Sequence, residues 1–143
     1  MSILVDTNVL LRRTQPEHPG HDIAVESMAR LLASGEILSF TLQNISESWN
    51  VATRPASKNR LGLPVSAVLT EVEKIEHFLM LLPDSISVYS EWKRLVVLHQ
   101  VLGSKVHDAK LVAAMKVHGV RRILHSMRKI SRAMTSRRFG RMC

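Results

Sequence analysis

The chain has 143 residues, of which 45% are hydrophobic and 22% are charged, and this length and composition fit a single globular domain. No apolar stretch is long enough to cross a bilayer, and the N-terminus lacks a signal-peptide pattern. The lone Cys143 excludes an intrachain disulfide, so we expect a protein of the reducing cytoplasm that does not contact a membrane.

The formal net charge of +8 is distributed very unevenly. Residues 1–120 carry 12 basic and 12 acidic side chains, whereas residues 121–143 carry eight basic side chains and no acidic one. A strongly basic chain ordinarily indicates a nucleic-acid or anionic-membrane partner, but here the body of the protein is neutral. We therefore expect one domain over residues 1–124 and an atypical, poorly ordered basic tail over residues 125–143.

Strands alternate with helices along the first half of the chain. The expected elements are a buried strand at residues 3–5, a helix at 21–33, a strand at 37–40 and a helix at 42–53. Thr7 and Asn8 supply capping side chains for a helix after the first strand. Gly35 and Pro55 are expected to end the two longer helices.

The second half continues the same alternation. We expect a helix that begins near Pro64, a strand at residues 86–89, a helix at 92–99, a helix at 107–115 that ends at Gly119, and a strand at 120–124. Repeated helix-to-strand crossovers predict an α/β fold, a parallel sheet covered by helices on both faces. In such sheets functional groups gather at the carboxyl ends of the strands.

Three acidic residues have informative positions. Asp6 follows the first strand, Glu47 lies within a helix, and Asp108 begins a late helix. Each one alone has a structural explanation, as a turn former, a solvated helix residue or a helix cap. Together, at one edge of a sheet, they form a set of hard oxygen ligands that suits Mg²⁺ or Mn²⁺.

Four segments carry a family resemblance. They read Val-Asp-Thr-Asn at residues 5–8, Asn-Ile-Ser-Glu at 44–47, Thr-Arg-Pro at 53–55 with Asn59 and Leu-Gly-Leu at 61–63, and His-Asp-Ala-Lys-Leu-Val-Ala-Ala-Met-Lys-Val-His-Gly at 107–119. In this order they resemble the PIN domain family, specifically the VapC-type ribonuclease toxins of VapBC-type, type II toxin–antitoxin systems. The resemblance runs from about residue 3 to residue 124.

This resemblance implies a PIN-like three-layer α/β/α sandwich with a central parallel sheet, and an endoribonuclease that hydrolyses RNA phosphodiesters with Mg²⁺ or Mn²⁺. By position, Asp6, Glu47 and Asp108 are the implied catalytic metal ligands. Asn8 and Ser46 are implied to orient those carboxylates, although helix capping explains both of them equally well. The implied partners are RNA, a cognate antitoxin and a second copy of the chain.

The resemblance stops at about His125, where family members carry Thr-x-Asn/Asp-x-x-Asp-Phe. Degenerate codons for residues 125–135 can be chosen so that one restored base yields Thr-Phe-Asn-Ala-Glu-Asp-Phe, which places the missing acid at Ile130. Our interpretation is a one-base frameshift or sequence error near the codon of His125. The family's last strand is then expected to be missing or disrupted, which leaves the edge of its neighbour exposed.

Two other functions remain open at this point. The chain can be a degenerate PIN domain that binds an antitoxin without cleaving RNA, or a nucleic-acid-binding protein that uses its basic tail. Trp49 and Trp92 lie in helical apolar patterns, so we expect core or interface aromatics there rather than base-stacking platforms.

Overall fold

The structure, a computed structural model, describes residues 2–55, 61–126 and 129–132 of the chain. The strands are β1 (Ser2–Val5), β2 (Ile37–Thr41), β3 (Met80–Leu82), β4 (Arg122–Ser126) and β5 (Lys129–Arg132). The helices are α1 (Thr7–Arg13), α2 (His21–Ala33), α3 (Leu42–Thr53), α4 (Val65–Phe78), α5 (Ile86–Leu98) and α6 (Lys105–Val117). None of the helices in this described part is long and apolar enough to cross a membrane.

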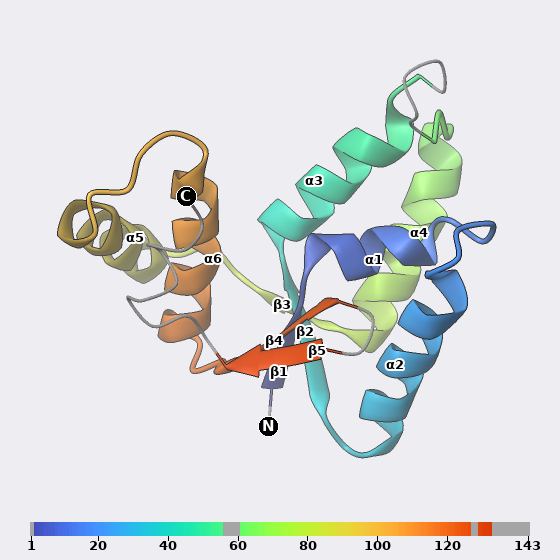
Figure 1. The fold of residues 1–143 in the computed structure, drawn as a ribbon, viewed down its shortest axis with the longest axis horizontal. Helices are drawn as coiled ribbons and strands as arrows, with labels where there is room; N and C mark the ends of the chain where they lie inside the picture. Colours follow the sequence, from blue (N-terminus) through green and yellow to red (C-terminus); the bar gives the residue numbers. More distant parts are fainter. Residues whose placement is uncertain (1, 56–60, 127–128, 133–143) are drawn as a thin grey trace.

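The strands form one sheet in the order β3-β2-β1-β4-β5, and the first four of them run parallel (Figure 1). β1 lies at the centre, with Leu4 beside Ser39 of β2 and Val5 beside Leu124 of β4. The predicted α/β class with a central parallel sheet is confirmed. The carboxyl ends of β1, β2 and β3 therefore lie at the same edge of the sheet.

Both faces of the sheet are buried under helices, which gives the three layers that Figure 1 shows. Alternate residues of β1 belong to two different cores. Ile3 and Val5 pack with residues of α1, α2 and α4, whereas Leu4 packs with Met115 of α6. The side chains of Ile3, Leu4 and Val5 are all fully buried. This explains the continuous apolar sequence of the strand, because a parallel strand between two helical layers has no solvent face.

Several sequence predictions of the elements are confirmed at residue level. α2 and α3 have the predicted bounds, and α2 and α6 end before Gly35 and Gly119. These two glycines have φ angles of +85° and +68°, which side chains with a Cβ rarely adopt. The chain therefore leaves each helix through the left-handed turn that the sequence indicated.

The predicted strand at residues 86–89 is wrong. Residues 86–89 form the first turn of α5, and the strand in this region is β3, which comes earlier in the chain. The hydroxyl of Ser85 accepts a hydrogen bond of 3.2 Å from the backbone N–H of Val88, which caps and starts the helix.

Of the two alternatives predicted for the last strand, missing or disrupted, the first is wrong, because a strand follows β4, while its pairing with β4 is irregular. β5 pairs antiparallel with β4, so the described structure has a strand along the edge that we expected to be exposed. The register of this pair shifts between Leu124 and Ser126. Ile130, the position of the expected missing acid, lies opposite Leu124, and Leu124 in turn lies opposite Val5. The boundary between a domain at 1–124 and a tail at 125–143 stays a prediction, since most of the tail lies outside the described residues.

Candidate metal centre

The site begins with Asp6, directly after β1. The backbone N–H of Asp6 donates a hydrogen bond of 2.9 Å to the carbonyl of Leu124, which extends the β1–β4 pairing by one residue. The carboxylate of Asp6 accepts a bond of 2.8 Å from the N–H of Thr7 and thereby caps α1. The cap of this helix is thus Asp6 itself, rather than the predicted Thr7 and Asn8. The junction of strand and helix holds this carboxylate in place from both sides.

The carboxylate of Glu47 is held by two hydrogen bonds from different elements. The hydroxyl of Thr7 donates to Oε2 at 2.9 Å, and the amide of Gln43, one turn earlier on α3, donates to Oε1 at 3.0 Å. The fully buried Asn44 donates to the Thr7 hydroxyl at 3.1 Å and is itself fixed by a capping box with Thr41. These bonds fasten α3 to the start of α1.

Asp108 lies in the first turn of α6 and is half-buried. Gln43 connects α3 to this turn, because its Nε2 also donates a bond of 3.0 Å to the carbonyl of His107. Its Oε1 is buried and makes no hydrogen bond within the described residues. A buried carbonyl oxygen without a partner is costly, and an ordered water would satisfy it. Gln43 thus joins the helices that carry Glu47 and Asp108.

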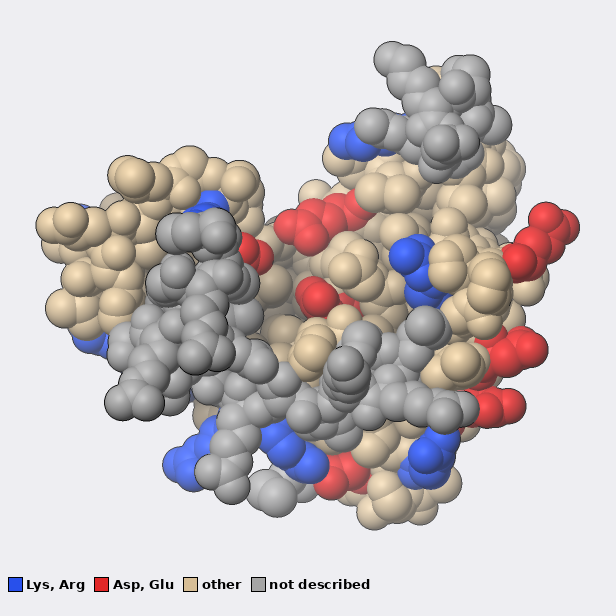
Figure 2. Space-filling model, in the orientation of Figure 1, with Lys and Arg blue, Asp and Glu red and all other residues tan. Residues whose placement is uncertain are grey.

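The three carboxylates influence one another electrostatically. Burial raises the pKa of Asp6, and the neighbouring charges of Glu47 and Asp108 raise it further, against the hydrogen bond from Thr7 and the charge of His125. Burial also raises the pKa of Asp108, with Glu47 as the next cause. Figure 2 shows acidic side chains around a hollow between α3 and α6. A bound cation would offset the free-energy cost of burying these charges and would reduce the repulsion between them.

The three acids offer the kind of oxygen donor that a magnesium-type ion prefers. In the described part of the chain, no three His, Cys, Asp or Glu side chains converge tightly enough to hold a metal ion as they stand. Mg²⁺ usually keeps several of its waters and uses only one or two carboxylates directly. Asp6, Glu47 and Asp108 supply carboxylate oxygens, the ligand type that such an ion prefers.

The structure gives no such role to the two predicted supporting residues. Asn8 and Ser46 are exposed, and neither side chain makes a hydrogen bond to the acids within residues 2–55, 61–126 and 129–132. Thr7, Gln43 and Asn44 support the site instead. The sequence could have indicated Gln43, because it lies four residues before Glu47 and residues i and i+4 of a helix are neighbours. Asn59 of the family motif lies outside the described residues.

His125, which the sequence analysis used only to mark the end of the resemblance, lies near the site on β4. Its positive charge lowers the pKa of Asp6, which opposes the effect of burial. His125 directly follows Leu124, whose carbonyl accepts the backbone hydrogen bond of Asp6, so this end of β4 lies next to Asp6.

Comparisons with known proteins agree with the fold. The profile of the PIN domain family matches residues 3–133. The crystal structure of Mycobacterium tuberculosis VapC20, described as a sarcin-ricin loop cleaving toxin, superposes with a TM-score of 0.63 at 17% identity and covers 86% of this chain and 88% of that one. VapBC2 from Rickettsia felis, bound to a DNA fragment from its promoter, superposes with a TM-score of 0.56 at 11% identity over 83% of each chain. No curated protein sequence matches the chain.

Proposed function

Because the chain belongs to the PIN domain family, we propose that it is a metal-dependent endoribonuclease toxin of a VapBC-type toxin–antitoxin pair. The observation that carries this proposal is that Thr7 and Gln43 tie Glu47 to the elements that carry Asp6 and Asp108, at one edge of the sheet. Burial raises the pKa of Asp6 and of Asp108, so their charged forms cost free energy that a bound cation would offset. The solved structures of similar fold, both from VapBC systems, support the same class.

Asp6, Glu47 and Asp108 would hold Mg²⁺ or Mn²⁺. When bound, such an ion neutralises charge on the phosphate, lowers the pKa of the attacking water and stabilises the leaving oxygen. Thr7 and Gln43 donate hydrogen bonds to both oxygens of Glu47, which fixes the direction of its free lone pairs.

The test is cleavage of a labelled single-stranded RNA with Mg²⁺ or Mn²⁺ and with a chelator. Asp108→Asn is expected to lower the rate roughly 100-fold or more, since loss of a metal ligand removes several kcal/mol of transition-state stabilisation. Asp22→Asn is the matched control, because Asp22 also lies in the first turn of a helix, α2, but is exposed and distant in sequence from the acid cluster. Equal rates for the two variants would contradict the proposal.

A second candidate is a degenerate PIN domain that binds an antitoxin without cleaving RNA. It is favoured by the wide spacing of the acids and by Ile130 at the position of the expected fourth acid. Antitoxin binding without cleavage would support it. Sequencing the gene from the codon of Gly119 onwards tests the frameshift interpretation, since an extra base would restore the acidic motif.

The basic tail is a third candidate binding element. Its residues from 133 onwards lie outside the described part of the chain, so the proposal rests on charge alone. If the tail grips RNA, deletion of residues 133–143 should weaken binding and flatten its salt dependence. An unchanged salt dependence would assign binding to the domain.

Protein partners are proposed for the β3 edge of the sheet. A groove of about 530 Å³ lies there between α3 and α4, and its apolar lining includes Leu42, Ile45, Val72 and Leu81. Leu42 and Leu81 are 59% and 49% exposed. An exposed apolar patch beside an unpaired strand edge is typical of a protein interface. We assign this face to the homodimer, and we propose a cognate antitoxin as the second partner, in a reducing cytoplasm.

A further inference from the structure

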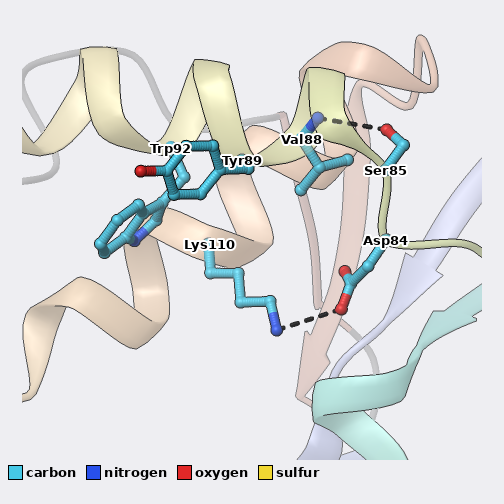
Figure 3. A pocket seen from close by; sticks show the side chains of 6 residues that line it. All are labelled: Asp84, Ser85, Val88, Tyr89, Trp92 and Lys110. Carbon is cyan, nitrogen blue, oxygen red and sulfur yellow. Dashed lines mark hydrogen bonds and ion pairs between the residues drawn. The ribbon is translucent and has the colours of Figure 1, made fainter.

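A pocket of about 320 Å³ lies where the β3–α5 loop, α5 and α6 meet (Figure 3). Its lining residues are Asp84, Ser85, Val88, Tyr89, Trp92 and Lys110. None of these belongs to the acid cluster, so the proposed cleavage chemistry leaves the pocket without a role.

Two aromatic rings form one wall of the pocket. Tyr89 and Trp92 lie one turn apart on α5, with ring centroids 6.2 Å apart and ring planes inclined by 32°. The indole N–H of Trp92 donates a hydrogen bond of 2.8 Å to the carbonyl of Val106, which fixes that ring against the start of α6. Tyr89 is 60% exposed. An exposed ring supported by a fixed one can accept a flat partner by stacking.

An acid and a base complete the lining of the pocket. The ammonium of Lys110 lies 3.2 Å from Oδ2 of Asp84, and Figure 3 shows the lysine extending from the side of the aromatic rings toward that carboxylate. Both side chains are more than a third exposed, so the pair itself adds little stability. The other oxygen of Asp84 makes no hydrogen bond to any residue that the structure describes. The pocket thus offers a stacking ring, a free acceptor and a charged donor.

We propose that this pocket binds a guanine base of single-stranded RNA, an inference that rests on the proposed nuclease function. Tyr89 stacks on the base, Asp84 accepts from the adjacent N1–H and N2–H groups, and Lys110 donates to O6. The Watson–Crick edge of a base is open to such contacts only in single strands. Guanine suits this pair best, because its edge sets two neighbouring donors beside an acceptor, and lysine is a common partner of O6.

The topology places this pocket beside the cleavage site. Asp84 follows β3 as Asp6 follows β1, and the two strands run parallel, so both acids lie at the same edge of the sheet. α6 carries Asp108 in its first turn and Lys110 two residues later. An RNA strand with one phosphate at the acid cluster can therefore present a nearby base to α5. The pocket would select the sequence that is cut.

Binding of guanosine 5′-monophosphate in the presence of a chelator tests this inference without any need for cleavage. Trp49→Phe leaves Trp92 as the single fluorescent indole, and a saturable quench is expected for this nucleotide. The chain should bind guanosine monophosphate at least tenfold more tightly than it binds the adenosine, cytidine and uridine monophosphates. Equilibrium dialysis with the unmodified chain gives the same comparison if the Trp49 variant does not fold.

Four variants locate the binding. Asp84→Asn and Tyr89→Leu should each weaken guanosine monophosphate binding at least fivefold, whereas Lys93→Ala, which removes an exposed lysine of α5, should leave it unchanged. Asp6→Asn should also bind normally, which separates this pocket from the metal centre. Equal affinity for all four nucleotides, no saturable binding, or binding that resists both pocket variants would each overturn the inference. If the unmodified chain bound guanosine monophosphate but did not cleave RNA, the nuclease proposal would be overturned and the pocket would stand.

Discussion

At the scale of single residues, the raised pKa of Asp6 makes a prediction about stability. Between the ordinary carboxyl pKa and the raised one, the folded chain binds more protons than the unfolded chain, so the free energy of unfolding falls as the pH rises. This loss is complete above the raised pKa. In chelator at pH 7, Asp6→Asn should therefore melt a few degrees higher than the unmodified chain, while it can still cap α1.

The pH dependence provides the control for this prediction. The difference in melting temperature between Asp6→Asn and the unmodified chain should shrink as the pH falls toward about 4, where aspartate is itself becoming neutral. Addition of Mn²⁺ should stabilise only the unmodified chain. If Asp6→Asn melts lower at neutral pH without metal, burial of this charge is not the destabilising factor that we infer.

Gln43 makes a second prediction, because it holds Glu47 and contacts the helix of Asp108. Gln43→Ala should lower RNA cleavage by about 10- to 100-fold, which is the usual effect of losing a residue that orients a metal ligand. The apparent metal affinity should fall with it, and excess Mn²⁺ should restore part of the rate. Asn50→Ala is the matched control on the same helix, since Asn50 is exposed and bonds only to Arg54 in the described structure. A rate that matches this control would leave Gln43 without a role.

The sequence indicated the acids better than their supporting residues. Asp6 and Asp108 were recognisable because a strand end and a helix start fix where they lie along the chain. The bonds of Glu47 come from Thr7, 40 residues earlier, and from Gln43, which also reaches His107, 64 residues later. Such contacts depend on the packing of three elements and on side-chain rotamers. Asn8 and Ser46 stay predictions without support from the geometry.

At the scale of elements, the Ser85 cap decides the start of α5. Val, Ile and Tyr in residues 86–89 favour a strand on intrinsic preference, but the hydroxyl of Ser85 stabilises a helical first turn over the same residues. Ser85→Ala should cost about 1 kcal/mol and lower the melting temperature by roughly 4 °C. Thermal unfolding followed by circular dichroism measures this.

Ser104→Ala is the control for the capping prediction. Ser104 also precedes a helix, α6, but its side chain makes no capping bond. Its replacement should change the melting temperature by less than about 1 °C. Similar losses for both variants would show that the Ser85 hydroxyl does not stabilise α5 in particular.

At the scale of the whole molecule, the three-layer arrangement was predictable and the last strand was not. Continuous apolar runs such as residues 3–5 indicate strands that are buried on both faces, and the helices between them fix parallel pairing. β5 has no such signal, because residues 129–132 carry two basic side chains and one isoleucine. β5 pairs through backbone groups, which every residue has. Neither the reading-frame interpretation nor the basic composition of this segment could therefore exclude a strand there.

The β3 edge makes a prediction about assembly. Leu81→Glu places a charge in the apolar groove and should convert a dimer to a monomer in size-exclusion chromatography with light scattering. Leu98→Glu is the control, because Leu98 is 62% exposed on α5, away from the groove residues. A dimer that survives Leu81→Glu, or a chain that is monomeric without any substitution, would remove this face as the homodimer interface.

The most direct measurement of the central claim is a calorimetric titration of the metal-free chain with Mn²⁺. If Asp6, Glu47 and Asp108 form one metal centre, the unmodified chain should bind Mn²⁺ at neutral pH, and Asp6→Asn, Glu47→Gln and Asp108→Asn should each weaken that binding at least tenfold. Asp22→Asn should leave it unchanged. Mn²⁺ binding that survives all three substitutions, or no binding by the unmodified chain, would contradict the metal centre on which the proposed nuclease function rests.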